Sequence, residues 1–232
     1  MVLVERDLLI SLLKLTKDGS VLIECVKKDA KIASDIALKL LKKLQNEGLF
    51  YLKDDFVDAD SGNRLRLAVK AVSLGADIEH VSEFLRWQEF EDISAVALER
   101  NGYLSRKNVR FKHGGRRWEI DVVGCRKPLV LCIDCKRWQR SVNPSALKKI
   151  VEAQVERARA LADTLPSPSL KVECVKWNKA KFVPVIVSLM PGSFKFYDDV
   201  PVVPVLQLQN FLTQLPAYVG SVKYFTKEFS HL

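Results

Sequence analysis

Hydrophobic residues recur along this chain at two different spacings, which separate predicted helices from predicted strands. Helical spacing, with apolar residues three and four apart, runs through residues 4–16, 90–103 and 145–165. Two apolar runs of strand length, Trp118–Val123 and Leu129–Cys135, stand on either side of a segment with Gly124 and Pro128. The second pattern predicts a β-hairpin, with its turn over residues 124–128.

The first 60 residues have a pattern of their own. Helices are predicted over 4–16, over 21–28 and from Ser34 to Gly48, followed by a strand at 49–52 that turns at Asp54-Asp55. This order resembles a winged helix-turn-helix module, whose third helix contacts DNA and here carries Lys39, Lys42 and Lys43. Residues 1–60 hold ten Lys or Arg against eleven Asp or Glu, so protein contact is an equal alternative to DNA contact.

The remaining pattern predicts a connector and an α/β domain. Two amphipathic helices within residues 61–86 form the connector, and the α/β domain is expected over 87–232. Behind the hairpin and the helix at 145–165, further strands are predicted at 170–176, 182–189 and 200–206, with a short helix at 207–215. We therefore expect a mixed central sheet flanked by helices.

Two acids interrupt the apolar hairpin. Asp121 lies between Ile120 and Val122, and Asp134 lies between Ile133 and Cys135. Because side chains alternate along a strand, Asp134 shares a face with Lys136. Buried charges require a partner or a metal, and the alternative is a solvated ion pair at a sheet edge. A hairpin symmetric about Arg126 would leave Asp134 about 10 Å beyond the position opposite Asp121, so a bend or a bulge is expected.

The helix predicted over 90–103 supplies another acid. Its apolar face includes Phe90, Ile93 and Leu98, and Glu91 lies at the border of that face at 100° per residue. Glu89, near the opposite border, is the competing candidate. Both have the alternative of being ordinary surface residues.

A helix Glu, a strand Asp and a strand Asp-x-Lys, in this order, resemble the PD-(D/E)XK nuclease superfamily. The resemblance extends over residues 84–215 and is nearest to archaeal Holliday-junction resolvases and Mrr-type restriction enzymes. It implies a restriction-endonuclease-like fold that hydrolyses DNA phosphodiesters with Mg²⁺, or with Mn²⁺ in its place. Two positions depart from the pattern in the family's name: Ile120 stands in place of its Pro, which many members lack, and Asp134 stands in place of the commoner Glu, where the name admits both.

The resemblance also implies a role for each site residue. Asp121, Asp134 and the backbone carbonyl of Cys135 would bind the metal, with Glu91 as a direct or water-mediated ligand. Lys136 would orient the attacking water or stabilise developing charge. Gln154, on the helix at 145–165, would assist the site, and a surface position is its alternative.

Charge is concentrated around this motif. The net charge is +9, and residues 101–140 hold eleven Lys or Arg against three acids. Positive fields of this kind attract phosphate backbones, and Arg116, Arg117 and Arg137 are the predicted DNA contacts. Five cysteines without framework spacing indicate reduced thiols, and we do not expect a zinc site.

Composition narrows the class of protein. A hydrophobic content of 48% argues against disorder, and no apolar run has the length of a membrane span, so we expect a cytoplasmic protein without membrane contact. A DNA-binding regulator without activity and an RNA nuclease are the alternative functions. A homodimer is possible, because resolvase-like members pair symmetrically. The motif does not select a DNA structure or sequence.

Overall fold

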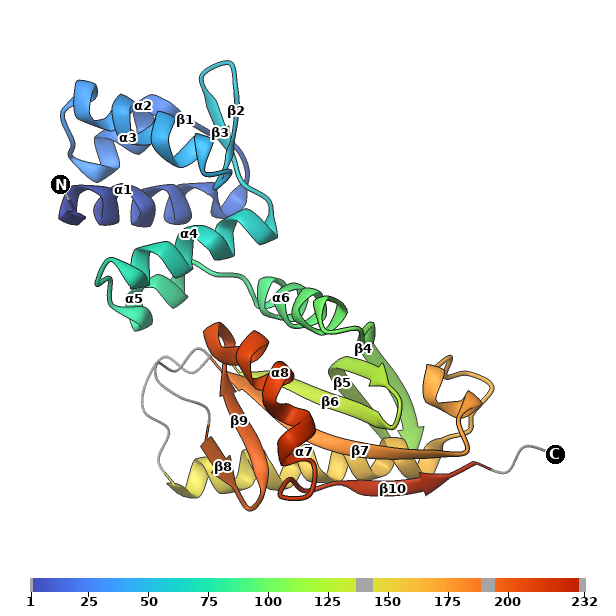
Figure 1. Cartoon of the computed structure of the whole chain (residues 1–232). Coiled ribbons are helices and arrows are strands. Elements are labelled where there is room, and N and C mark those ends of the chain that lie inside the picture. Colours follow the sequence, from blue (N-terminus) through green and yellow to red (C-terminus); the bar gives the residue numbers. More distant parts are fainter. Residues whose placement is uncertain (1, 137–143, 189–194, 230–232) are drawn as a thin grey trace. The chain divides into compact units, whose positions relative to one another are not determined.

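The computed structural model describes residues 2–136, 144–188 and 195–229, which form two compact units (Figure 1). The first is Met1–Asp92 and the second is Ile93–Leu232. Within these ranges no helix combines the length and the apolar character that crossing a bilayer requires. The division of function into residues 1–60, 61–86 and 87–232 stays a prediction.

The first unit is built from helices and a small antiparallel sheet in the order β1-β3-β2. Its elements are α1 (Val2–Leu15), η1 (Thr16–Asp18), β1 (Val21–Leu22), α2 (Ile23–Ala30), α3 (Ser34–Asn46), β2 (Tyr51–Lys53), β3 (Phe56–Asp58), α4 (Ser61–Ser73) and α5 (Ile78–Glu83). The predicted turn at Asp54-Asp55 is confirmed, since it joins β2 to β3. The winged helix-turn-helix assignment stays a prediction.

Leucine side chains form the core of the first unit. Leu8, Leu9, Leu12 and Leu13 of α1 are fully buried, as their helical spacing predicts. The stripe of α3 is buried as well, and comprises Ala37, Leu40, Leu41 and Leu44. Lys39 and Lys42 of the same helix are exposed.

The second unit is a seven-stranded mixed sheet flanked by helices, which confirms the predicted restriction-endonuclease-like core (Figure 1). The strand order is β4-β5-β6-β7-β9-β8, with β10 paired to β7. The β6–β7 and β7–β9 pairs are parallel and the others are antiparallel. Its strands are β4 (Leu104–His113), β5 (Arg116–Arg126), β6 (Leu129–Lys136), β7 (Lys179–Ser188), β8 (Lys195–Tyr197), β9 (Val200–Pro204) and β10 (Phe225–Glu228). Its helices are α7 (Pro144–Thr164), η2 (Glu173–Lys176), η3 (Val205–Gln207) and α8 (Leu208–Tyr218), and α6 (Trp87–Arg100) begins in the first unit and ends here.

The two faces of the β5–β6 hairpin pack against different helices. Val130 and Cys132 share a buried cluster with Ala158 and Leu161 of α7. On the opposite face, Leu98 of α6 lies so close to β5 that a Cβ at Gly124 would be 2.7 Å from its Cδ2. The alternation of side chains predicted for β6 is therefore confirmed.

The hairpin turn is shorter than predicted. β5 continues to Arg126, β6 begins at Leu129, and only Lys127 and Pro128 lie between them. Gly124 was assigned to the turn, and this was wrong, because the glycine lies within β5 where Leu98 leaves no room for a side chain. Close packing, rather than a turn, accounts for this glycine.

Two further predictions about strands need correction. The strand predicted at 170–176 is wrong: local bonds, such as Trp177 N–H to Cys174 O at 3.0 Å, form the 3₁₀ helix η2 in its place. Leu170, Val172 and Cys174 are still buried, so the alternation reports burial and not a strand. β4 was missed because it is an edge strand in which only Val109 and Phe111 are buried.

Candidate active site

The register of the hairpin differs from one that is symmetric about Arg126. Arg126 pairs with Leu129, and the ladder continues to Val122 opposite Ile133. The ladder ends there, one residue before Asp121 on β5 and one residue before Asp134 on β6. The predicted offset of about 10 Å was wrong, because the two-residue turn shifts the centre of the hairpin away from Arg126.

The strands are irregular at Asp121. β4 pairs with β5 at Lys107–Val122 and at Val109–Ile120, and skips the position between them, where Asn108 has φ 53°. Ile120 and Val123 both belong to the cluster against α7, so the alternation of β5 changes phase here. Asp121 leaves the regular ladder, and its Oδ2 accepts a hydrogen bond from the backbone N–H of Cys135 at 2.7 Å.

Asp134 is a buried carboxylate between two cations. It is 4% exposed. Nζ of Lys136 lies 2.8 Å from its Oδ2, and Nη1 of Arg157 lies 3.2 Å from its Oδ1. The Lys136 contact is not in hydrogen-bond geometry, so Oδ2 is buried without a hydrogen-bond donor from any described residue. Two cations compensate a charge that would be costly to bury alone.

Gln154 and Arg157 approach this carboxylate from α7. Gln154 is fully buried, so the surface alternative was wrong, and its Nε2 donates to Cys132 O at 2.6 Å. Its Oε1 accepts from Nη1 of Arg157 at 3.4 Å. The sequence interpretation placed Arg157 near the apolar stripe of this helix, three residues after Gln154, but gave it no role at the site.

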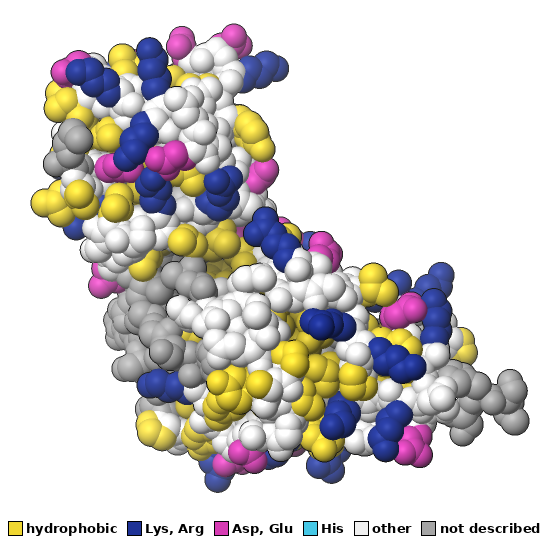
Figure 2. Space-filling model, in the orientation of Figure 1, with side chains coloured by type: hydrophobic (Ala, Val, Ile, Leu, Met, Phe, Trp, Pro, Cys, Tyr) yellow, Lys and Arg dark blue, Asp and Glu magenta, His cyan; other side chains and the backbone are white. Residues whose placement is uncertain are grey.

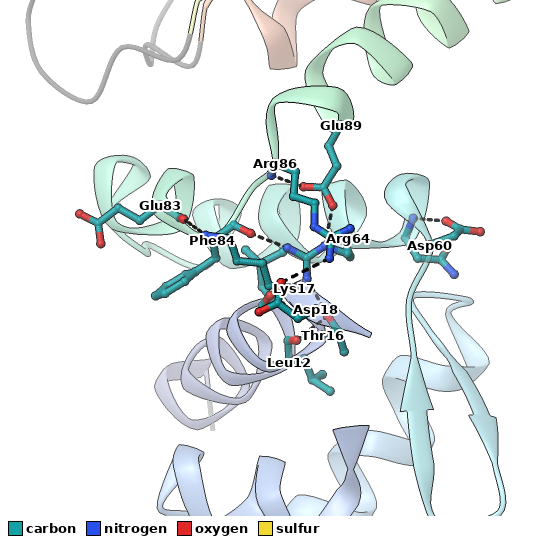
Figure 3. Close-up of polar contacts among 12 residues, drawn as sticks. Leu12, Thr16, Lys17, Asp18, Asp60, Arg64, Glu83, Phe84, Arg86 and Glu89 are labelled. Atoms are coloured by element: carbon teal, nitrogen blue, oxygen red, sulfur yellow. Dashed lines mark hydrogen bonds and ion pairs between the residues drawn. The ribbon is translucent and has the colours of Figure 1, made fainter. Parts of the chain in front are cut away.

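The two glutamates of α6 have different surroundings. Glu89 is 1% exposed, accepts from Nε of Arg64 at 2.5 Å and also accepts the backbone N–H of Arg86 at 2.7 Å (Figure 3). Arg64 donates further to Leu13 O and to Phe84 O, so this buried ion pair joins α1, α4 and the segment before α6. Glu89 is thus engaged in structure within the first unit. Glu91 is 5% exposed and belongs to the first unit, and its role as a ligand stays a prediction.

The donor set suits a hard cation that keeps several waters. The described residues contain no group of three His, Cys, Asp or Glu side chains placed to hold a metal. Mg²⁺ needs only one or two carboxylates, with water and phosphate completing its shell. The buried Oδ2 of Asp134 without a donor, close to Asp121 and the Cys135 backbone, fits such an ion.

The cysteines of the hairpin do not fit a thiolate metal site. Burial, followed by the neighbouring Cys125, raises the pKa of the Cys132 thiol, which therefore stays protonated. Cys135 lies on the other face, where its Sγ is 3.6 Å from Oγ of Ser94. The two thiols of the Cys-x-x-Cys sequence thus point away from each other, so they cannot bind one zinc ion together.

The described residues among the predicted DNA contacts are exposed, and one of them, Lys43, also forms an ion pair within the fold. Lys and Arg side chains are spread over the visible surface of both units, with Asp and Glu side chains among them (Figure 2). Arg116 and Arg117 are exposed, and the guanidinium of Arg116 lies 4.3 Å from the centre of the Trp118 ring. Nζ of Lys43 pairs with Glu5 at 2.8 Å, so its charge is partly used within the fold. Arg137 lies outside the described residues.

Comparisons with known proteins find a family model and an archaeal relative that are similar to this chain. The family model Mrr_cat, "Restriction endonuclease", matches residues 83–163. An uncharacterized protein of Archaeoglobus fulgidus is 32% identical over 140 residues, which are 59% of this chain and 96% of that protein.

Two solved structures are also similar to this chain. A protein of unknown function, AF1548, has a TM-score of 0.30 at 19% identity, over 43% of this chain and 46% of that one. Protein VC1899 from Vibrio cholerae has a TM-score of 0.40 at 13% identity, over 95% of this chain and 51% of that one. The chain spans about half the length of these two proteins.

Proposed function

Because this chain belongs to the restriction endonuclease family, whose model matches residues 83–163, we propose that it cleaves DNA phosphodiester bonds with Mg²⁺ as its cofactor. One observation carries the proposal. Oδ2 of Asp121 accepts a hydrogen bond from the backbone N–H of Cys135, the residue after Asp134, at 2.7 Å, and the ammonium group of Lys136 lies 2.8 Å from Asp134. Two carboxylates and a lysine in a basic region suit hydrolysis of a phosphate ester.

The side chains have distinct roles in this proposal. Asp121, Asp134 and the carbonyl of Cys135 hold the cation, with Glu91 as a further ligand. When bound, Mg²⁺ makes water a better nucleophile and offsets charge on the phosphate. Lys136, 26% exposed, donates to the attacking water or to a phosphate oxygen, and Gln154 keeps the end of β6 at a fixed distance from α7.

The division of labour along the chain is part of the proposal. Residues 1–60 act as a winged helix-turn-helix module, 61–86 connect, and 87–232 cleave. Lys39 and Lys42 on the exposed face of α3 support DNA contact by the module, whereas the Lys43–Glu5 pair weakens that support. This activity would serve DNA repair, recombination or restriction. As a homodimer, two copies of the chain would cut the two paired strands.

A cleavage assay tests the proposal. The full chain is incubated with supercoiled, linear, branched and single-stranded DNA, and with RNA, in Mg²⁺, in Mn²⁺ and in EDTA. Nicking or cleavage of DNA that requires the divalent cation, and that Asp134→Asn abolishes, is the expected result. The conservative change removes one charge while keeping the volume of the side chain.

Two results would replace this function with another. Binding of DNA without cleavage under every condition would favour a regulator that keeps the nuclease fold. Cleavage of RNA alone would change the proposed substrate from DNA to RNA, which is chemically possible because the carboxylates and the lysine act on the phosphate and not on the sugar.

A further inference from the structure

A groove runs along β4, the edge strand of the second unit, beside the segment that follows α7. It consists of three adjoining hollows: the first and second share Arg106 and Lys171, and the second and third share Arg110 and Ser169. We call it the edge groove. Its defining residues are the basic side chains Arg106, Lys107, Arg110, Lys112, Lys171 and Lys176.

The charge of the edge groove is strongly one-sided. With Arg117, its lining has seven Lys or Arg against two glutamates, a net of +5. Both glutamates are paired, Glu119 with Arg110 at 3.1 Å and Glu173 with Lys176 at 3.0 Å. The basic partners remain 73% and 71% exposed, and exposed pairs of this kind stabilise a protein by only about 0 to 1 kcal/mol. A phosphate can therefore replace either glutamate at little cost.

Hydroxyl groups add neutral hydrogen-bond donors to the same surface. Ser167 and Ser169 line the third hollow, and the bond between their hydroxyls at 3.0 Å uses only one of their two hydrogens. Ser105 and Thr164 also line the groove, but they donate to Glu99 and to Ala160 O. Phosphate oxygens in protein–DNA complexes accept bonds from Lys and Arg together with Ser and Thr. The chemistry of the edge groove is thus that of a surface for a phosphate backbone.

The middle hollow of the edge groove lies one strand away from Asp121 of the candidate active site. Asn108 lines its middle hollow, and Asn108 is the β4 residue at the skipped position beside Asp121. From Arg106 to Lys112 the strand extends about 20 Å at its usual rise. That length matches about six base pairs, at 3.4 Å per phosphate along one strand.

We propose that the edge groove binds the backbone of the DNA substrate on one side of the scissile phosphate. The inference rests on the proposed function, for which it supplies the path of the substrate. A second copy of the chain is the competing occupant, since β4 is an edge strand of the sheet that the described residues form. Symmetric pairing of two β4 strands would set the basic side chains of one copy against those of the other, which disfavours that occupant.

Binding of DNA in the absence of cleavage tests the edge groove. The test variant carries Arg106→Gln, Lys112→Gln and Lys171→Gln in the full chain. The control carries Lys195→Gln, Lys223→Gln and Lys227→Gln, which remove the same charge from β8, β10 and the segment before β10. Affinity for a labelled duplex of about 20 base pairs is measured in EDTA over a range of salt concentrations.

We expect the test variant to bind roughly 10- to 100-fold more weakly than wild type at low salt, with a salt slope smaller by about 2 to 3. The control should stay within about 3-fold of wild type, since it retains the groove. Thermal unfolding confirms that both variants fold. Equal weakening in the two variants, or wild-type affinity and slope in the test variant, would overturn the inference.

Analytical sedimentation, which measures the oligomeric state, distinguishes DNA from a second copy of the chain as the occupant of the edge groove. A wild type that dimerises, with a test variant that is monomeric yet binds DNA normally, would assign the edge groove to a second copy and overturn the inference. The same experiments distinguish failure of the proposed nuclease function from failure of the proposed DNA-binding groove. Groove-dependent binding without metal-dependent cleavage removes the nuclease activity and keeps the groove, whereas cleavage with groove-independent binding does the reverse.

Discussion

The backbone N–H of Cys135 donates to Oδ2 of Asp121 across 2.7 Å, and this bond takes over where the regular β5–β6 ladder has ended at Val122 and Ile133. A hydrogen bond from a side chain thus connects β5 to β6 beyond the last pair of backbone hydrogen bonds. The same carboxylate is a proposed metal ligand. Asp121 therefore has both a structural and a proposed catalytic role, and comparing two substitutions of this residue distinguishes the two roles.

Asp121→Asn and Asp121→Ala should differ in stability and agree in function. The amide oxygen of Asn can still accept the Cys135 N–H, whereas Ala removes this acceptor at a cost of about 1 to 3 kcal/mol. Both remove the charge, so both should lose cleavage and most Mn²⁺ affinity. Urea unfolding and calorimetric Mn²⁺ titration measure the two properties. Equal stability of the two variants would contradict the structural role of the bond.

Lys136→Met should abolish cleavage while the fold and most DNA affinity remain. Nζ of Lys136 lies 2.8 Å from Asp134, and its loss removes a charge that acts at the reacting phosphate. A group of this kind contributes about 10²- to 10³-fold to the rate. Lys148→Met is the matched control, because Lys148 is 59% exposed on α7 and pairs only loosely with Glu152 at 3.9 Å. Wild-type cleavage by Lys136→Met would end the catalytic assignment.

Arg157→Gln should make stability depend on the divalent cation. Arg157 compensates the buried charge of Asp134 at 3.2 Å, and its removal leaves Lys136 as the remaining described cation beside that carboxylate. The melting temperature in EDTA should fall, and Mg²⁺ should restore more of it than in wild type, because the bound ion replaces the missing charge. An equal fall with and without Mg²⁺ would mean that Arg157 acts through packing alone.

Gly124→Ala tests the contact between α6 and β5 within the second unit. The added Cβ would lie 2.7 Å from Cδ2 of Leu98, which is fully buried, so overpacking should destabilise the protein by about 1 to 3 kcal/mol. Leu98→Ala opens space at the same point. In the double variant Gly124→Ala should cost less than it does alone, which a double-mutant cycle of unfolding free energies measures. Additive costs would contradict direct contact.

The elements that the sequence predicts correctly are those whose pattern is local. Apolar residues of α1 and α7 recur at helical spacing, and β6 is a continuous apolar run bounded by turn residues, so each can be recognised without its partners. The Asp134-x-Lys136 pair follows in the same way from strand alternation. β4 was missed because an edge strand has little apolar surface to reveal it.

Features that depend on distant segments were not predictable. The register of Asp121 against Asp134 depends on the number of residues in the turn, and the change of phase at Asp121 depends on Asn108 in the neighbouring strand. Arg157 meets Asp134 only because α7 crosses that face of the sheet. No periodicity within one segment records these relationships.

The stability of the first unit should decrease in acid through Glu5. Burial alone would raise the pKa of Glu5, but hydrogen bonds and charges from Lys43 and Lys70 outweigh it and hold the pKa below its ordinary value. A carboxyl with a lowered folded pKa contributes stability that is complete above its unfolded pKa of about 4.3, and that is lost as the pH falls through the folded value. Acid should therefore remove the advantage of wild type over a neutral variant.

Glu5→Gln measures this contribution directly. The difference in unfolding free energy between wild type and Glu5→Gln should be largest above about pH 5 and should shrink toward about pH 3. Asp35→Asn, at an exposed position in the first turn of α3, is the control and should show no comparable trend. Amide hydrogen exchange in α1 and α3 locates the effect in the first unit, because Glu5 and Lys43 join these two helices at 2.8 Å. A difference that stays constant across the pH range would place the effect of Glu5→Gln in packing rather than in charge.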